Sequence, residues 1–128
     1  MHGDESPLRE EEQVPIPSVW RPVIEAMVAC MAAGDWQLDN APRNVARVDQ
    51  KDARLLAAAV DAYGAGPLVP LPAATWETSI SMWQPINERW DLLVDLWTAE
   101  GAIDLVLFVE VYPTDDIYEF RVYSMYVP

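Results

Sequence analysis

Residues 89–112 read RWDLLVDLWTAEGAIDLVLFVEVY, and this stretch decides the fold class. Its side chains alternate with a period of two, which is typical of strands that bury one face. Gly101 lies between two such runs, within TAEGAI, and suits a tight turn. The stretch therefore predicts two long antiparallel strands, WDLLVDLW (90–97) and DLVLFVEVY (104–112), joined as a hairpin.

Two further segments follow the same rhythm. TWETSISMW (75–83) is expected to be a strand that ends at Pro85–Asn87, and IYEFRVYSMYV (117–127) is expected to close the sheet after the turn PTDD. In the first segment, alternation places Trp76, Thr78, Ile80 and Met82 on one face and Glu77, Ser79 and Ser81 on the other. The second half of the chain is therefore predicted to form four strands.

The first half of the chain shows helical spacing instead. One helix is expected to begin near Ser18, as its N-cap, and to stop at Gly34. Its apolar stripe consists of Trp20, Val23, Ile24, Met27, Val28 and Met31. A second helix is predicted from Asp49 or Gln50 to Tyr63, with Asp49 as the cap and Gly64 as the stop.

The predicted order α-α-β-β-β-β defines an α+β domain with two layers. Two N-terminal helices would pack on one face of a four-stranded antiparallel meander. Residues 18–128 would form this single domain, and the acidic, proline-punctuated residues 1–17 would form a flexible arm or a short extended lead-in.

Charge narrows the classes of function. The 128 residues are 52% hydrophobic and carry a formal net charge of −13 at pH 7. Binding to nucleic acid or to an anionic membrane surface needs a cluster of basic residues, so we expect neither kind of binding. An acidic chain of this kind either gains solubility or meets a basic partner, whose approach the charge accelerates.

The location expected is the cytosol. No apolar run approaches the ~20 residues of a membrane helix, and the start MHGDESPLREEEQ has no hydrophobic segment typical of a secretory signal. The single Cys30 excludes an internal disulfide and fits a reducing compartment.

The residues do not predict an active site. The only histidine is His2, in the tail, so histidine-based catalysis has no base within the predicted domain, and no cofactor is expected. A carboxylate metal site would need Asp91 and Asp104 to face each other across the strand pair. We expect neither a metal site nor an enzyme, and we interpret Glu77, Glu88 and Arg89 as a surface salt-bridge set.

Acids are concentrated in the strand half. From residue 75 onward ten acids stand against Arg89 and Arg121. Alternation places several of them on the face that the helices leave free, interleaved with large aromatic residues, which is typical of a protein-binding surface. The residues predicted to bind a partner are Asp91, Asp95, Trp97, Asp104, Phe108, Glu110, Tyr112, Glu119 and Tyr123. The alternative is that Trp97 and Phe108 are covered by the N-terminal arm or by a second copy of the chain.

The hairpin residues carry a family resemblance. Asp95-Leu96-Trp97-Thr98, Glu100-Gly101 and Asp104-Leu105 follow a helix that ends in Ala33-Gly34-Asp35. Over most of residues 19–127 this resembles a bacterial family of small domains of unknown function with a D-L-W-T-x-E-G-x-x-D-L hairpin. The family pattern often has a second acid before the glycine, where this chain has Ala99. In size, charge and architecture the chain is also similar to immunity proteins that neutralise bacterial toxins.

These observations lead to a hypothesis of protein binding. We expect an immunity-type inhibitor that docks the acidic, aromatic face onto a basic toxin domain, for example a nuclease, and occludes its active site. The carboxylates Asp91, Asp95, Asp104 and Glu110 would imitate a polyanionic substrate, while Trp97, Phe108 and Tyr123 would supply affinity. The alternative is a ligand-binding or enzymatic domain with a pocket between the first helix and the sheet. A structural or oligomeric role, such as a homodimer, is the third hypothesis.

Overall fold

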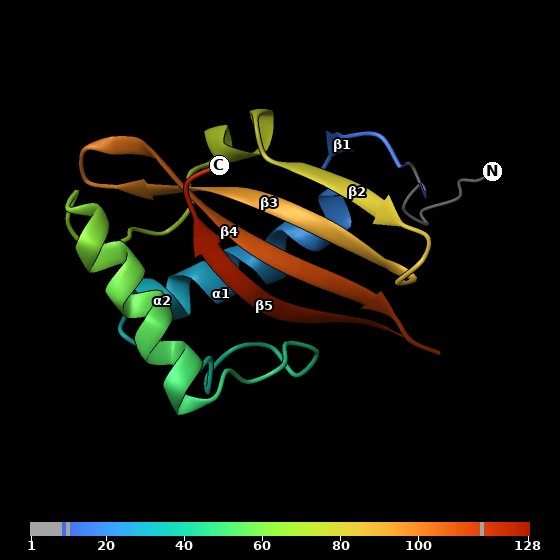
Figure 1. Ribbon diagram of the computed structural model, residues 1–128, viewed down its shortest axis with the longest axis horizontal. Helices are drawn as coiled ribbons and strands as arrows, with labels where there is room; N and C mark the ends of the chain where they lie inside the picture. Colours follow the sequence, from blue (N-terminus) through green and yellow to red (C-terminus); the bar gives the residue numbers. More distant parts are fainter. Residues whose placement is uncertain (1–8, 10, 116) are drawn as a thin grey trace.

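A computed structural model of the chain describes residues 9, 11–115 and 117–128. Within them, two helices lie against one face of a five-stranded antiparallel sheet of order β1-β2-β3-β4-β5 (Figure 1). The elements are β1 (Val14–Pro15), the 3-10 turn η1 (Ser18–Trp20), α1 (Arg21–Ala32), α2 (Gln50–Tyr63), the 3-10 turn η2 (Ala73–Glu77), β2 (Ile80–Gln84), β3 (Arg89–Thr98), β4 (Gly101–Pro113) and β5 (Tyr118–Tyr126). The predicted α+β class is confirmed.

The hairpin of β3 and β4 forms the centre of the sheet. Leu92 pairs with Val109, and Val94 pairs with Leu107. All four side chains are 0% exposed, because they point toward the helical layer, which we call the inner face of the sheet. The alternation read from the sequence therefore assigned this inner row correctly.

Helix α1 supplies most of the opposing layer. Ile24, Met27 and Val28 recur at helical spacing and are 0% exposed, as the apolar stripe predicted. Ser18 does not cap this helix. It opens η1, and α1 begins after Trp20 with no side-chain cap.

Helix α2 has the ends that the sequence predicted. The carboxylate of Asp49 accepts a 2.8 Å hydrogen bond from the backbone N–H of Asp52, and Gly64 closes the helix at φ 84°. At this end the hydroxyl of Tyr63 accepts a hydrogen bond of 2.9 Å from the backbone N–H of Asp104. The contact ties the end of α2 to the β3–β4 hairpin.

The strand predicted over residues 75–83 begins later than expected. Residues 73–77 form η2, because Trp76 donates a 3.1 Å indole hydrogen bond to Glu25 of α1 and Thr75 donates its hydroxyl to the backbone oxygen of Asp95. Within β2 the predicted alternation holds, but it is the serines that face the helices. Ser79 and Ser81, at 2% and 1% exposed, turn inward, while Ile80 and Met82 lie on the opposite face.

The sheet has five strands rather than four. Val14 pairs with Ser81 and Pro15 with Ile80, so the end of the predicted N-terminal arm forms β1 at the edge of the sheet (Figure 1). Ile16 follows and is 1% exposed. Residues 1–8 and 10 of the predicted flexible arm, His2 among them, lie outside the described residues.

The other edge of the sheet is partly covered by the connection between the helices. The backbone N–H of Phe120 donates to Asn44, and Ala46 donates back to the oxygen of Phe120, which makes a parallel bridge along β5. In the described part of the chain, no helix has the length and apolar character needed to cross a bilayer.

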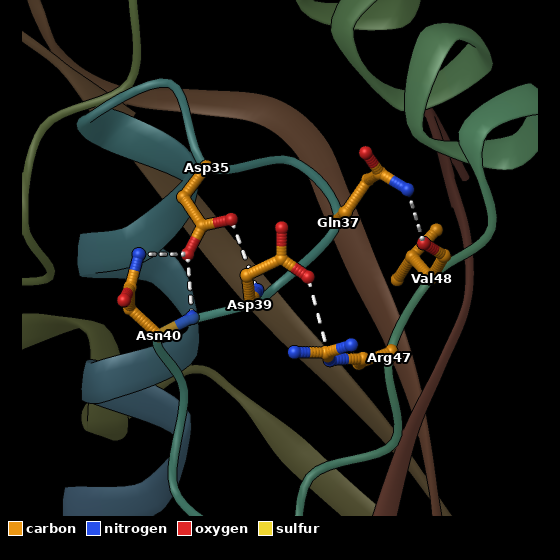
Figure 2. A network of polar contacts seen from close by, with 6 residues as sticks. All are labelled: Asp35, Gln37, Asp39, Asn40, Arg47 and Val48. Atoms are coloured by element: carbon orange, nitrogen blue, oxygen red, sulfur yellow. Dashed lines mark hydrogen bonds and ion pairs between the residues drawn. The ribbon is translucent and has the colours of Figure 1, made fainter.

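A carboxylate organises the start of this connection (Figure 2). Asp35 accepts hydrogen bonds from the backbone N–H groups of Asp39, at 3.0 Å, and Asn40, at 2.8 Å. It also accepts one from the Asn40 side chain at 3.2 Å. The turn it fixes holds Leu38 at φ 60° and 2% exposed, a conformation that is uncommon for a leucine.

The pKa of Asp35 follows from these contacts. Burial raises it, but the hydrogen bonds from Asn40 and Asp39 outweigh burial and hold the pKa below its ordinary value of 3.8. Burial also raises the pKa of the neighbouring Cys30 thiol, and Asp35 raises it further. Cys30 is thus biased toward the neutral thiol, in keeping with a packing role.

Asp35→Asn is expected to lower the free energy of unfolding by roughly 0.5–1 kcal/mol at neutral pH, since the turn loses a charged acceptor. A carboxylate with a lowered pKa stabilises the fold fully above its unfolded value, and this contribution is lost as the pH falls through the folded value. The difference in free energy of unfolding between the wild type and Asp35→Asn, measured by urea titration, should therefore become smaller below about pH 4. Asp39→Asn is the control, because Asp39 pairs only with a 74% exposed Arg47. A gap independent of pH would contradict the role given to Asp35.

Candidate functional site

The candidate site is the outer face of the sheet, the face turned away from the helices. In Figure 1 the helix α1 passes behind β3, β4 and β5, so this face looks toward the viewer. The strand register arranges its side chains in rows. One row is Met82, Asp91, Glu110 and Arg121, and the next is Ile80, Leu93, Phe108 and Ser124.

An ionic network occupies one end of the outer face. Arg89 Nε lies 2.8 Å from Asp91 Oδ1 and 3.3 Å from Glu110 Oε2. These side chains are 20%, 9% and 11% exposed, respectively. The hydroxyl of Tyr112 donates to Glu110 Oε1 at 3.0 Å. One arginine thus compensates two carboxylates that face each other across β3 and β4.

The electrostatics of this network follow from its contacts. The hydrogen bond to Asp91 raises the pKa of Arg89, and the charge of Glu110 adds to the rise. Burial raises the pKa of Tyr112, and the hydrogen bond to Glu110 raises it further. Both shifts favour the protonated forms of Arg89 and Tyr112, which are the forms that make these contacts.

The interpretation of Arg89 as part of a surface salt-bridge set was wrong. Arg89 pairs with Asp91 and Glu110 rather than with Glu88, as the surface interpretation had it. Arg121 pairs with Glu119 at 3.1 Å and lies 5.7 Å from the ring of Tyr112. The signal was present in the sequence, because Arg89 and Asp91 are two residues apart on one strand and must share a face.

The centre of the outer face is apolar. The rings of Phe108 and Tyr123 lie 4.9 Å apart, and Tyr123 is 65% exposed. Leu93 pairs directly with Phe108, and Ile80 pairs with Leu93. A register shift in β5 opposite Phe108 and Val109 brings Ser124, rather than Tyr123, opposite Phe108. We call Ile80, Leu93, Phe108 and Tyr123 the apolar centre.

Three predicted residues lie away from this centre. The backbone oxygen of Asp95 accepts from Thr75, and its carboxylate bonds the hydroxyl of Thr78 at the border of the outer face. Trp97 is half-buried, packs against the core, and has an indole nitrogen with no partner among the described residues. Asp104 is exposed beside Tyr63 at the end of α2. The structure therefore brings together Asp91, Phe108, Glu110, Tyr112, Glu119 and Tyr123, leaves Asp95 at the border of the outer face, and places Trp97 and Asp104 elsewhere.

Hollows in the surface lie beside α2 rather than beneath α1. One of about 710 Å³ and one of about 320 Å³ adjoin each other, since Trp36 and Ala57 line both. The interface of α1 with the sheet is filled, with Ile24 and Met27 at 0% exposure. These two hollows are built mainly on α2 and on the connection after α1.

The arrangement of carboxylates gives no metal centre. Asp91 faces Glu110 rather than Asp104 across the strand pair. Within residues 9, 11–115 and 117–128, no group of three or more His, Cys, Asp or Glu side chains is placed to hold a metal ion.

The fold and the outer face define a class: a two-layer α+β domain whose sheet is open on one side. The chain belongs to the family described as Domain of unknown function (DUF7668), whose model matches residues 28–128. The match begins inside α1 and includes β2 to β5. No curated protein and no solved structure gives a significant match. The expected membership in a family of domains of unknown function is confirmed, while the hairpin signature and the likeness to immunity proteins stay predictions.

Arg89→Met is expected to lower the free energy of unfolding by about 2 kcal/mol, because it leaves Asp91 and Glu110 together with no cation. Arg121→Met is the matched control. Its guanidinium is 54% exposed, so the loss should stay below about 0.5 kcal/mol. Thermal and urea unfolding measure both. Equal losses in the two variants would show that the carboxylate pair does not depend on Arg89.

Proposed function

We propose that this domain binds a basic protein through the outer face of its sheet. The observation that carries the proposal is the apolar centre, because its aromatic rings lie on a face that neither α1 nor α2 covers. Phe108 and Tyr123 are rigid side chains with large area, the type that supplies most of the energy of protein interfaces. The ionic network at one end would fix the orientation of the partner.

The charge distribution supports a basic partner. Five of the eight basic residues have contacts inside the described part of the chain: Arg9, Arg21, Arg47, Arg89 and Arg121. The other three, Arg43, Lys51 and Arg54, are exposed on α2 and the segment before it. The outer face itself carries Asp91, Asp95, Glu110 and Glu119 against Arg89 and Arg121, so it adds to a net charge of −13 that would steer a cationic surface toward the apolar centre.

We propose further that the partner is a toxin domain and that the domain is an immunity-type inhibitor acting in the cytosol. Inhibition by occlusion needs only a rigid complementary face, and a hydrogen-bonded sheet provides one. The imitation of a polyanion is revised by the geometry. Asp91 and Glu110 are compensated by Arg89, so steering would come from the net charge and affinity from the rings.

A second candidate has its own observation. The adjoining hollows beside α2 share Trp36 and Ala57, and together they could accommodate a small ligand. Of the ionisable residues that line them, Asp35 has a lowered pKa, but its carboxylate is engaged by the backbone N–H groups of Asp39 and Asn40. Protein binding is therefore the leading proposal. A homodimer through the outer face is the third candidate.

The test uses the product of the neighbouring gene as the candidate partner. The wild-type protein should restore growth when that product is toxic, and the two purified proteins should form a complex. The double variant Phe108→Ser/Tyr123→Ser should weaken the complex roughly 30-fold or more, because it removes the apolar centre. Isothermal titration calorimetry and growth rescue measure the two effects.

Ile86→Ser is the matched control, since Ile86 is 94% exposed in the turn between β2 and β3, away from the apolar centre. It should bind and rescue like the wild type. The proposal fails if the neighbouring product neither binds nor harms growth, or if the double variant binds equally well. A dimer in light scattering that the double variant dissociates would assign the face to a second copy of the chain instead.

A further inference from the structure

A cluster of aromatic rings lies at one end of the inner face, on the opposite side of the sheet from Asp91. Trp83 pairs with Trp90 across β2 and β3, and their ring centroids are 4.6 Å apart in an edge-on arrangement. Trp20 meets Trp90 at 5.1 Å, and Tyr118 meets Trp90 at 5.7 Å. The cluster joins the start of the helical layer to three strands of the sheet.

A guanidinium group closes this cluster. Arg9 Cζ lies 4.6 Å from the ring centroid of Trp83 and 5.8 Å from that of Trp90. Both distances are within the range of cation–π attraction. Arg9 is itself exposed, and no carboxylate of the described residues forms an ion pair with it. The contacts that hold its side chain here are therefore those with the indole rings.

We propose that Trp83 and Trp90 form a guanidinium-binding site that Arg9 occupies in cis, and that an arginine side chain of a basic protein partner binds there when Arg9 leaves. The site is independent of the outer face, because these indoles turn toward the helical layer. It gives the domain a second contact for an arginine-rich surface and makes the N-terminal segment a competitor of that partner.

Arg9 can leave without dismantling the sheet. The anchors of the N-terminal segment lie further along the chain, where Val14 and Pro15 pair with β2 and Ile16 is 1% exposed. Residues 11–13, which lie between Arg9 and these anchors, are exposed. Displacement of Arg9 therefore exposes the face of Trp83 while β1 and the core remain in place.

The chemistry of the site favours arginine over other cations. A guanidinium is planar and weakly hydrated, so it stacks on an indole face with less loss of hydration than an ammonium group. Glu11 and Glu12 follow Arg9 closely in the sequence, Glu88 precedes Trp90 by two residues, and all three are exposed. Their negative charge favours a cationic ligand over a neutral one.

The experiment follows the indole N–H signals of the full chain by NMR, with the Trp83 signal assigned from Trp83→Phe. The probe is the peptide acetyl-Gly-Arg-Gly-amide, and its partner probe carries citrulline, which has the same shape without the charge. In Arg9→Ala, the arginine peptide should shift the Trp83 signal to saturation. The wild type should need a roughly five-fold or higher peptide concentration, because Arg9 competes.

Arg9→Gln serves as a second variant of similar length, and Arg47→Ala is the matched control, since Arg47 is a 74% exposed arginine paired with Asp39. Arg47→Ala should titrate like the wild type. The proposal is overturned if neither Arg9 variant shows a saturable shift, if citrulline acts as well as arginine, or if the wild type binds equally tightly. A dimer that depends on Arg9 would also overturn it, because the occupant would then be a second copy.

The double variant Phe108→Ser/Tyr123→Ser separates this inference from the proposed function. It removes the apolar centre of the outer face and should leave the peptide titration of Trp83 unchanged.

Discussion

The pairing of β3 with β4 is the constraint on which the other features depend. Each residue pair of this hairpin places one side chain against the helices and the next one outward, so the inner and outer faces are fixed together. Leu92 and Val109 are completely buried on the inner side, while the neighbouring pair Asp91 and Glu110 is forced onto the outer side. A shift by one residue would bury the carboxylates under α1, which the cost of burying charge forbids. The apolar row therefore selects the register, and the register creates the carboxylate pair that Arg89 must compensate.

Local signals account for the part of the fold that the sequence predicted. The cap at Asp49 and the stop at Gly64 depend on one or two residues each, and both are where the pattern placed them. The alternation in β3 and β4 was also predicted correctly, because it repeats over many residues. The edge of the sheet was harder to predict, because β1 is only two residues long and has no periodicity of its own. The segment at η2 departs from its apparent alternation because Trp76 bonds Glu25, 51 residues away in the chain, and no local pattern contains that contact.

The candidate site was predicted in part for the same reason. Alternation correctly gathered Asp91, Phe108, Glu110 and Tyr112 on one face. The compensation of the acids by Arg89 was not predicted, because Arg89 was assigned to a surface salt-bridge set with Glu88. Its spacing of two residues from Asp91 on one strand would have placed the two side chains on the same face. Trp97 lies beyond the point where the register between β3 and β4 shifts, and such irregularities decide which residues at a strand end still belong to a face. The register shift in β5 likewise places Ser124, rather than Tyr123, opposite Phe108.

The distribution of arginines connects the two proposed interactions. Most of the few cations of this acidic chain are engaged by its own residues. Arg89 lies between two carboxylates, Arg121 pairs with Glu119, and Arg9 lies over indole rings. Each of these contacts has a counterpart that a foreign arginine could also meet, namely an acid or an aromatic face. The chain thus has, on both sides of its sheet, surfaces whose chemistry suits a guanidinium group. The two sides differ in how the cation is held. Arg89 is fixed within a strand and compensates two nearly buried carboxylates, so it stays in place. Arg9 lies upstream of the first anchor of the chain and can leave. The aromatic end of the inner face is therefore where we propose exchange with a basic partner, and the outer face is where we propose steering and docking.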